Sequence, residues 1–454
     1  MNARPLAMAL SLSLTLAAAA SAQEEPSQPA PEAKPAAKAK TPTYYGDIAA
    51  IVQKRCQNCH RPGAIGPFPM TTYKEVAGWA AMIHEVVGNG RMPPWHADAP
   101  HGTFANDRRL PQAEKDAILA WVDAGAPKGD LAQAPKPVTW PEPNAWRLGK
   151  VDAVVEEEKT FSVPATGSVP YQYSYVKTNF DEDKWIKGLE VKVDAPGVVH
   201  HVLIFVIYPE RHKSPRVRGG LRGYFASALP GDAIAPFPEG AAKFLPKGAT
   251  LVFQTHYTPN GTAQKNHSRL GLLFAKPEEK ITRRVQTKSV HTMRINIPAG
   301  AEAHKVRATY DFKQDQMLYG LLPHMHLRGK SFYYILRYPD GSVDKLLDVP
   351  KYDFNWQNTY RFAQPRFVPK GSRMIGVAVY DNSDKNPANP DPTRTVRFGE
   401  QTWDEMMIGY MDLVEASAAE RAAWEAERAQ EKPAVEKKTQ PAPSKEEPKT
   451  RSFK

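Results

Sequence analysis

Short strand-like runs fill the long central part of this 454-residue chain and constrain its fold more than any other feature. Between Phe161 and Leu413 there is no long amphipathic helical pattern, and glycine, proline, asparagine and aspartate separate the apolar runs. A span of about 250 residues favours two sandwiches, so we predict two all-β sandwich domains, over 156–285 and 286–417. The main predicted strands are Val198–Tyr208, Thr250–Tyr257, Met317–Leu322 and Met374–Tyr380, with a hairpin formed by Ser331–Tyr338 and Val343–Val349.

The N-terminal residues have the pattern of a secretory signal peptide. Arg4 precedes an apolar run over 6–19, and small residues at 20–22 form a cleavage site. The alternative, a retained membrane anchor, needs an apolar run of about 20 residues. We therefore predict removal of 1–22, a periplasmic or secreted location, and no transmembrane segment afterwards.

Composition separates the remaining parts of the chain. Residues 23–42 are rich in proline, alanine and charge, which predicts a disordered linker. Residues 131–155 form a second proline-rich linker, and 418–454 are expected to be a charged, disordered tail after a short Ala/Glu/Arg helical pattern. The net charge of +11 is modest for this length, and the scattered basic residues show no nucleic-acid-binding pattern.

Residues 43–130 are expected to form an all-α domain. Apolar residues at helical spacing precede Cys56, and Thr72 with Glu75 makes a capping-box pattern. An apolar stripe from Val76 to Val87 ends at Gly88-Asn89-Gly90, and a further helix should begin at Pro111.

The only two cysteines form a C-x-x-C-H motif with the histidine that follows them, Cys56-Gln57-Asn58-Cys59-His60. This is the attachment motif for one covalent c-type haem. On a helical turn both thiols and the imidazole share a face, so the thiols reach the vinyl groups while the imidazole binds iron. The alternatives are a redox dithiol or a chance match.

Met92 is the predicted sixth iron ligand. It lies in Arg91-Met92-Pro93-Pro94-Trp95, where two prolines stiffen the loop that presents the thioether. A thioether opposite a histidine raises the haem potential. The competing residues are Met70, Met82, His84 and His96. This segment resembles small class I cytochrome c domains, which implies electron transfer.

Five further histidines, among 13 in the chain, stand in patterns that suggest metal binding. His324 and His326 are two residues apart, so a strand places both imidazoles on one face. His200 and His201 are adjacent and would diverge on a regular strand, so one metal can take both only at a bulge or a strand end. His256 follows in Gln254-Thr255-His256-Tyr257.

Four motifs, in order, resemble the copper type II, ascorbate-dependent monooxygenases, the family of peptidylglycine α-hydroxylating and dopamine β-monooxygenases. The motifs are Val199-His200-His201-Val202-Leu203, Gln254-Thr255-His256-Tyr257, Pro323-His324-Met325-His326-Leu327-Arg328-Gly329 and Trp403-Asp404-Glu405-Met406, and the resemblance includes Tyr352-Asp353-Phe354-Asn355-Trp356-Gln357. The likeness covers about Pro170 to Val414. It implies two jelly-roll-like domains, each with one copper ion, facing across a solvent-filled cleft.

The same resemblance implies the copper ligands. His200, His201 and His256 would hold an electron-storing copper, and His324, His326 and Met406 would hold the catalytic copper. Met407 is the adjacent competitor of Met406, and Met411 is a more distant one. A thioether with imidazoles suits copper over zinc, although zinc held by histidines alone remains the alternative.

Two departures from the family affect what is expected. The animal relatives use several disulfides, whereas Cys56 and Cys59 are the only cysteines here. The peptide-amidating enzyme has an arginine two residues before its H-x-H motif, where this chain has Leu322. A peptidylglycine substrate is therefore not supported, and the substrate stays open.

These patterns together predict an exported monooxygenase that hydroxylates a C–H bond of a small molecule with dioxygen. Electrons would enter through the haem from a redox protein or an ascorbate-like reductant. The alternative is an electron-transfer or copper-binding protein with no hydroxylase activity.

Overall fold

The computed structural model describes residues 40–142, 145–209, 223–230 and 236–436. The predicted signal peptide, most of the linker over 23–42 and the end of the tail lie outside these residues. No helix among the described residues combines the length and apolar character needed to cross a bilayer.

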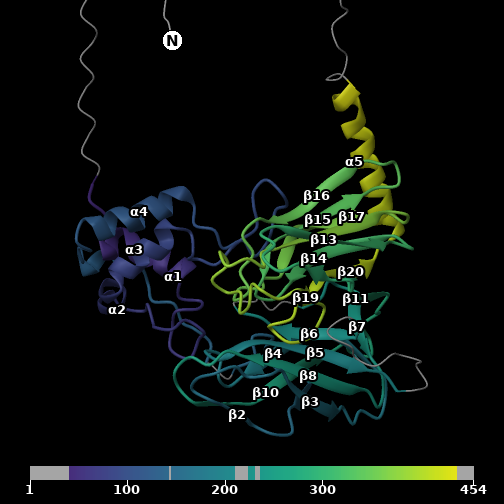
Figure 1. Cartoon of the computed structure of the whole chain (residues 1–454), viewed down its shortest axis with the longest axis horizontal. Coiled ribbons are helices and arrows are strands. Elements are labelled where there is room, and N and C mark those ends of the chain that lie inside the picture. The colour runs from purple at the N-terminus through teal and green to yellow at the C-terminus, as the bar shows by residue number, and fades with distance from the viewer. Residues whose placement is uncertain (1–39, 143–144, 210–222, 231–235, 437–454) are drawn as a thin grey trace, which may run out of the picture. The chain divides into compact units, whose positions relative to one another are not determined.

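The regular elements of the described segment between residues 44 and 133 are helices (purple and blue in Figure 1). Their shared core contains Ile48, Val52, Ile118 and Trp121. The elements are η1 (Tyr44–Ile48), α1 (Ala49–Arg55), α2 (Tyr73–Gly78), α3 (Ala80–Gly88), α4 (Gln112–Asp123) and η2 (Leu131–Gln133).

Two details of this segment test the sequence reading. The capping box predicted at Thr72 and Glu75 is confirmed, since each side chain pairs with the other residue's backbone N–H. The apolar stripe from Val76 to Val87 is divided between two helices, because the backbone leaves the helical conformation at Trp79.

Strands dominate the rest of the described chain, as predicted. The strands are β1 (Ala153–Glu156), β2 (Phe161–Val163), β3 (Gln172–Lys177), β4 (Lys184–Val193), β5 (Val199–Ile207), β6 (Tyr224–Ala228), β7 (Ala241–Leu245), β8 (Thr250–Tyr257), β9 (Gln264–Asn266), β10 (Ser268–Phe274), β11 (Arg283–Thr292), β12 (Asn296–Ile297), β13 (His304–Asp311), β14 (Gln316–His324), β15 (Gly329–Arg337), β16 (Val343–Val349), β17 (Tyr360–Val368), β18 (Arg373–Tyr380), β19 (Val396–Arg397) and β20 (Met407–Glu415). The expected hairpin is confirmed as β15 and β16.

One large sheet runs through both halves of the β region, in the order β1-β10-β4-β7-β11-β20-β14-β17. A short parallel pairing of β7 with β11 joins its two halves. The sheet β3-β8-β5-β6 shares one apolar core with the first half, and the sheet β13-β18-β15-β16 shares another with the second half. The β region therefore consists of two β-sandwiches, each with its own apolar core.

Both faces of β5 are buried, and they face different neighbours. Val202, Ile204 and Val206 point into the first core. Leu203 and Phe205 point the other way, into a separate apolar cluster that includes residues of β14 and β20. Successive side chains of a strand alternate between its faces, so His201 lies on the same side as Leu203 and Phe205. This second face positions the site described below.

The loop after Trp95 leaves the helical core and packs into the second sandwich core. Trp95 and Phe104 are both buried there, and their rings contact Tyr360 at centroid distances of 4.9 and 5.6 Å. Asn106 donates to the Thr359 carbonyl at 2.7 Å. Part of the segment over 43–130, which was expected to form an all-α domain, therefore packs into the β region.

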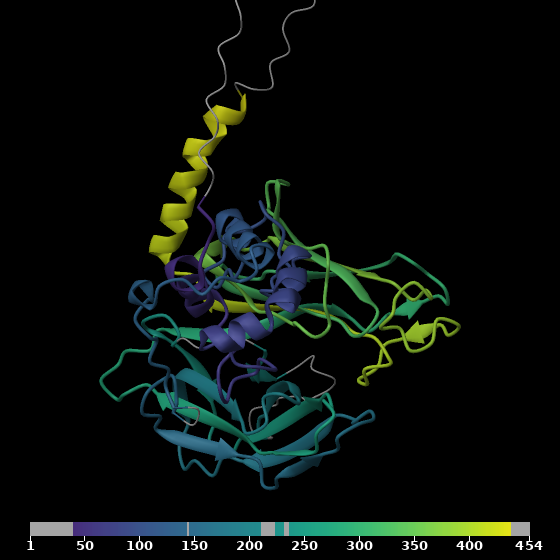
Figure 2. The ribbon, with the colours of Figure 1, turned by 90° about the vertical axis from the view of Figure 1, so that its left-hand side faces the viewer.

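The prediction of disorder from residue 418 is wrong for the first part of the tail. Residues Ala418–Glu436 form helix α5, the yellow helix in Figure 2. The ring of Trp424 stacks on Phe367 at 5.1 Å, and Arg421 pairs with Asp315. One partly buried aromatic ring and this ion pair hold a helix whose composition alone does not predict an anchored segment. Residues 437–454 lie outside the described part.

We expect Phe104→Ala to lower the free energy of unfolding by about 3–5 kcal/mol, the usual cost of deleting a buried phenylalanine ring. Phe104 is only 6 % exposed and lies in the second core. Denaturant unfolding followed by tryptophan fluorescence measures the change. Val154→Ala, on a side chain that is 46 % exposed, is the control and should change stability by less than about 0.5 kcal/mol. Equal effects of the two substitutions would contradict the packing of the loop.

Candidate metal centre

The first histidine group consists of His200, His201 and His256 on the paired strands β5 and β8. His201 lies opposite His256, and the register shifts between Val199 and His201, so His200 occupies a β-bulge. One ring nitrogen from each of the three histidines lies within 4.8 Å of the other two. The bulge removes the divergence that adjacent residues have on a regular strand, and all three imidazoles converge.

The second histidine group consists of His324, the last residue of β14, and His326 in the turn that follows. β14 pairs with β20 in a register that puts His324 opposite Ile408. Continued by two residues, this register puts His326 opposite Met406. Met406 packs in the same apolar cluster as Ile408 and Leu322, which places its side chain on the face of His324.

The two competing methionines face the other way. Met407 and Met411 are fully buried in the second sandwich core. Because β20 alternates its side chains between two faces, neither thioether shares the face of His324 and His326. Of these three methionines, only Met406 therefore has its side chain on the face of His324.

A buried carboxylate fixes the turn that carries His326. Glu405 is fully buried and accepts the backbone N–H groups of His326 at 2.9 Å and Arg328 at 2.7 Å. Arg328 is also buried, and its guanidinium donates to Asn382 Oδ1 and to the Trp403 carbonyl. Burial raises the pKa of Glu405 to about 8, against the lowering effects of these N–H donors and of Arg328. The turn and the residues before Met406 are thus tied together.

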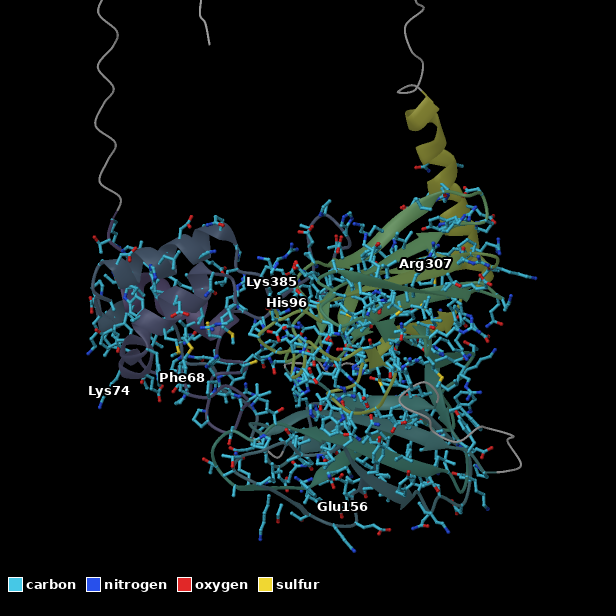
Figure 3. The ribbon with its side chains drawn as sticks, viewed as in Figure 1. Phe68, Lys74, His96, Glu156, Arg307 and Lys385 are labelled. Atoms are coloured by element: carbon cyan, nitrogen blue, oxygen red, sulfur yellow. The ribbon has the colours of Figure 1, made fainter. Side chains whose placement is uncertain are left out.

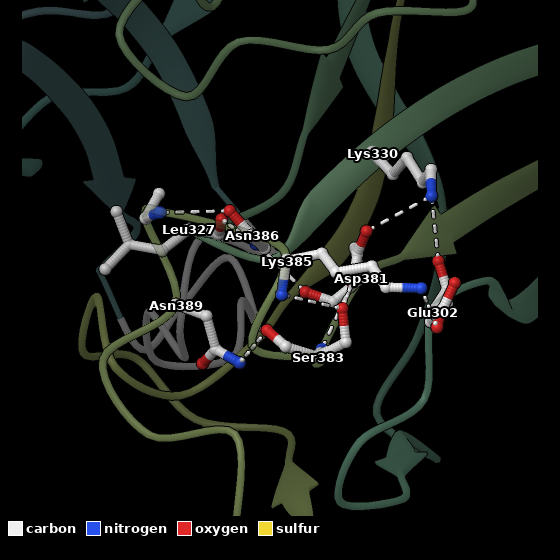
Figure 4. A network of polar contacts seen from close by, with 9 residues as sticks. Glu302, Leu327, Lys330, Asp381, Ser383, Lys385, Asn386 and Asn389 are labelled. Carbon is white, nitrogen blue, oxygen red and sulfur yellow. Dashed lines mark hydrogen bonds and ion pairs between the residues drawn. The ribbon is translucent and has the colours of Figure 1, made fainter.

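A polar network on the outer side supports the same turn (Figure 4). Asn386 donates to the Leu327 carbonyl at 3.2 Å and to the Asp381 carbonyl at 2.9 Å. Asp381 accepts from Ser383 and pairs with Lys330. The contact of Asn386 with Leu327 holds the backbone immediately after His326, and Asp381 links Asn386 to Ser383 and Lys330.

Hydrogen bonds orient the rings of the second histidine group. His324 Nδ1 lies 2.6 Å from Gln357 Oε1, and His326 Nδ1 lies 3.2 Å from the Asp404 carbonyl. Both partners are acceptors, so each Nδ1 carries the proton and each Nε2 keeps its lone pair. Partners of this kind set the tautomer of metal-binding histidines.

Within the two histidine groups, four buried ring nitrogens have no hydrogen-bond partner among the described residues. They are His200 Nε2, His201 Nε2, His256 Nδ1 and His326 Nε2. An unpaired buried polar atom costs free energy, so such a concentration calls for a ligand. Imidazole nitrogens with one thioether are donors that suit copper, and this donor set fits a metal ion at each group.

Burial keeps these imidazoles neutral. It lowers the pKa of His200 to about 3 and the pKa of His256 and His324 to about 4, and it depresses the pKa of His201 and His326 well below the usual value. Repulsion between neighbouring imidazolium charges adds to the effect for four of the five. A neutral ring is the form that binds a metal.

The two histidine groups face each other directly. The ring centroids of His201 and His324 are 6.1 Å apart. Beside them, Leu203 and Phe205 of β5 pack against Leu322 and Ile408 in one apolar cluster. The family resemblance implies a solvent-filled cleft at this position, whereas here apolar side chains of the facing sheets are in contact.

The cysteine cavity, defined by Cys56, Cys59 and His60 on its wall, has a volume of about 780 Å³. That size falls within the range of about 300–1,000 Å³ found for pockets that bind small molecules and cofactors. The backbone continues the helical turn through the motif, since His60 N–H donates to the Cys56 carbonyl at 2.9 Å. Both cysteines are free.

The details of this wall favour a bound group over a redox dithiol. His60 Nδ1 lies 3.0 Å from the carbonyl of Phe68, labelled among the helices in Figure 3, so its Nε2 is left for a ligand. A Cβ on Gly66 would lie only 2.8 Å from His60 Nδ1, so glycine lets the loop pass close to the ring. Burial raises the pKa of Cys56 to about 12, which opposes the thiolate that dithiol exchange requires.

Among the predicted sixth ligands, the structure separates methionines from histidines. Met92 lines the cysteine cavity, as do Met70 and Met82, whereas His84 and His96 do not. His84 instead lies 3.2 Å from Asp123.

The cysteine cavity also reaches the first histidine group. His200 forms part of its wall, together with Asn355 and Trp356 of the loop before β17. One imidazole thus belongs both to the cavity wall and to a group of metal-binding donors.

Some residues of the site were not assigned a role from the sequence. Gln357 and Phe354 were only part of a quoted motif, and their contacts with histidines depend on the packing of a distant loop. Tyr171 is buried with its ring 4.9 Å from His256, and no pattern in the sequence marks it.

Comparisons with known proteins leave the family open. No family model and no curated protein matches the chain. A structure of infectious bursal disease virus, Gx strain, is 7% identical over 59% of this chain and 73% of its own, with a TM-score of 0.19. A structure of allantoicase is 8% identical over 50% of this chain and 83% of its own, with a TM-score of 0.15. Likenesses this weak carry no argument about fold or function.

The metal-free protein should lose stability as the pH falls below about 6.5. In the unfolded chain the five histidines titrate near 6.5, whereas in the folded protein their pKa values are depressed. The unfolded state then binds more protons, and each histidine contributes a slope of about 1.4 kcal/mol per pH unit down to its folded pKa. Urea unfolding between pH 7 and pH 5 checks this.

In the same series, His256→Gln should reduce that slope, and His291→Gln, on an exposed side chain, should leave it unchanged. A pH-independent stability would show that the imidazoles are not buried in the neutral form.

Gln357→Leu should weaken metal binding at the second histidine group by about 10–100-fold, because it removes the acceptor that fixes the His324 tautomer. Competition with a chelator of known affinity measures the change. Gln314→Leu is the matched control, since Gln314 is exposed and, among the described residues, its side chain bonds only Glu415. Unaltered binding in the first variant would mean that the Gln357 contact does not orient the ligand.

Proposed function

We propose that this chain is an exported, haem- and copper-dependent monooxygenase that hydroxylates a C–H bond of a small molecule. The observation that carries the proposal is the convergence of five buried histidines from segments far apart in the sequence, with Met406 in the adjoining apolar cluster, beside a cavity lined by Cys56, Cys59 and His60. The haem-binding segment would be an all-α cytochrome c domain, and the sandwiches would be jelly-roll-like.

The overall reaction consumes dioxygen, two electrons and two protons and returns the hydroxylated product and water. The two histidine groups would each hold a copper ion, which would supply one-electron redox chemistry. Cys56, Cys59, His60 and Met92 would hold a haem, which would supply a further one-electron carrier. His324, His326 and Met406 are the groups assigned to the hydroxylating site. His200, His201 and His256 are assigned to electron storage.

The chain's own residues would prepare the site in three ways. Gln357 and the Asp404 carbonyl hold the protons of His324 and His326 on Nδ1, which directs Nε2 to the metal. Glu405 fixes the turn between them and Met406. The apolar cluster of Leu203, Phe205, Leu322 and Ile408 excludes water beside the two groups.

His200 supports electron entry through the haem. It is part of the cysteine cavity wall and also belongs to the first histidine group. His200 would therefore be both a neighbour of a haem in that cavity and a ligand of the first copper. A periplasmic or secreted redox protein, or an ascorbate-like reductant, would be the donor to the haem.

The purified protein is expected to carry one covalent haem and two copper ions per chain, measured by pyridine haemochrome and by elemental analysis. On stopped-flow mixing, haem reduced in the copper-free protein should be reoxidised when Cu(II) is added in the absence of dioxygen. Zn(II), added at the same concentration, should leave the haem reduced. Haem that stays reduced with Cu(II) would rule out this electron route.

Met406→Ile should abolish substrate-dependent oxygen uptake while leaving copper at the first histidine group. Met407→Ile is the matched control, because Met407 is the neighbouring residue and points into the second core. The two variants separate the enzyme from a protein that only transfers electrons or binds copper. Oxygen uptake that survives in Met406→Ile would favour that second function.

A further inference from the structure

Phe354 lies between the two histidine groups. Its ring stacks on His200 at a centroid distance of 4.5 Å and an interplanar angle of 20°. The same ring is 5.7 Å from His256 and 6.2 Å from His326, the latter in an edge-to-face contact. One aromatic side chain therefore touches members of both groups.

The backbone around Phe354 is fixed to the second histidine group. Tyr352 OH donates to the Met325 carbonyl at 2.8 Å and accepts from the Met325 N–H at 3.0 Å. Three residues after Phe354, Gln357 bonds His324. The ring is thus carried by a loop whose two ends are tied to the turn that holds His324 and His326.

The same loop also meets the cysteine cavity. Asn355 and Trp356 form part of its wall. Asn358 Nδ2 donates to the Pro94 carbonyl at 3.4 Å, two residues after Met92. Any displacement of this loop would therefore change the geometry of both histidine groups and of the cysteine cavity.

The spacing between the histidine groups leaves little material between them. His201 and His324 are separated by a centroid distance of 6.1 Å with their planes nearly perpendicular. The apolar cluster alongside, which includes Leu203 and Leu322, holds the two sheets together. Sheets in apolar contact do not leave a water layer between the groups that they carry.

We propose that the two histidine groups form one closely spaced two-metal centre, and that Phe354 is the positioning residue that sets its spacing. The inference rests on the proposed function and adds to it that the copper ions interact directly. In a turnover, the first group would lose one electron and the second would gain it through the facing imidazoles of His201 and His324. No solvent-filled gap has to be crossed.

The test uses the full chain with its haem oxidised and both groups loaded with Cu(II). Electron paramagnetic resonance should show dipolar broadening and a half-field transition from paired copper ions. A preparation loaded with Cu(II) diluted in excess Zn(II) carries the same haem and should lose both features. This reference separates copper–copper coupling from coupling to the haem.

Phe354→Leu should bind the same amount of copper and lose part of the dipolar broadening, because the aromatic ring that stacks on His200 and fixes its position is removed. Phe367→Leu is the matched control, since Phe367 stacks on Trp424 of α5 and contacts neither histidine group. It should retain the coupling of the unaltered protein.

Each outcome of these experiments tests a different part of the proposal. Failure to bind copper would overturn the proposed function together with this inference. Two bound copper ions with independent, unbroadened signals would overturn the two-metal centre and leave the proposed function intact. Full coupling in Phe354→Leu would keep the centre and remove the role given to Phe354.

Discussion

The burial of five neutral imidazoles between two facing sheets is the constraint on which the rest of the site depends. Water does not reach most of their ring nitrogens, and four of these have no partner among the described residues. Removing such groups from water costs free energy unless something binds them. The stability of the facing sheets and the affinity of the site for a metal are therefore linked. The apolar cluster around Leu203 and Leu322 stabilises the contact between the sheets, and the buried imidazoles require a ligand for their unpaired nitrogens.

Residues outside the histidine groups determine how that requirement is met. Gln357 and the Asp404 carbonyl choose the tautomers of His324 and His326. Glu405, which is buried with Arg328 nearby, accepts the backbone N–H groups of His326 and Met406 and so ties the turn of His326 to Met406. Phe354 joins the two groups through ring contacts. These residues come from loops, where a backbone held by many hydrogen bonds can direct side chains that strands cannot reach.

Several elements could be predicted from the sequence because their signals are local. The β-rich run of β8 and the capping box at Thr72 need only a few neighbouring residues, and both are present. Adjacency of His200 and His201 required a bulge if both were to bind one metal, and the bulge is there. Disorder over 418–436 was wrong, because the ion pair of Arg421 with Asp315 and the stacking of Trp424 on Phe367 depend on partners far away in the chain.

The sequence by itself determined which donors exist and which of them are close neighbours in the chain: the cysteine pair with His60, the H-H pair, and the H-x-H pair. Strand and helix periodicity act over a few residues, so they specify the face on which each member lies. Only the tertiary structure decided that His256 joins His200 and His201, that Met406 rather than Met407 faces His324, and that His200 borders the cysteine cavity. Those relations arise from the register between strands and from the packing of one sheet on another, which bring together residues with no local signal of their proximity.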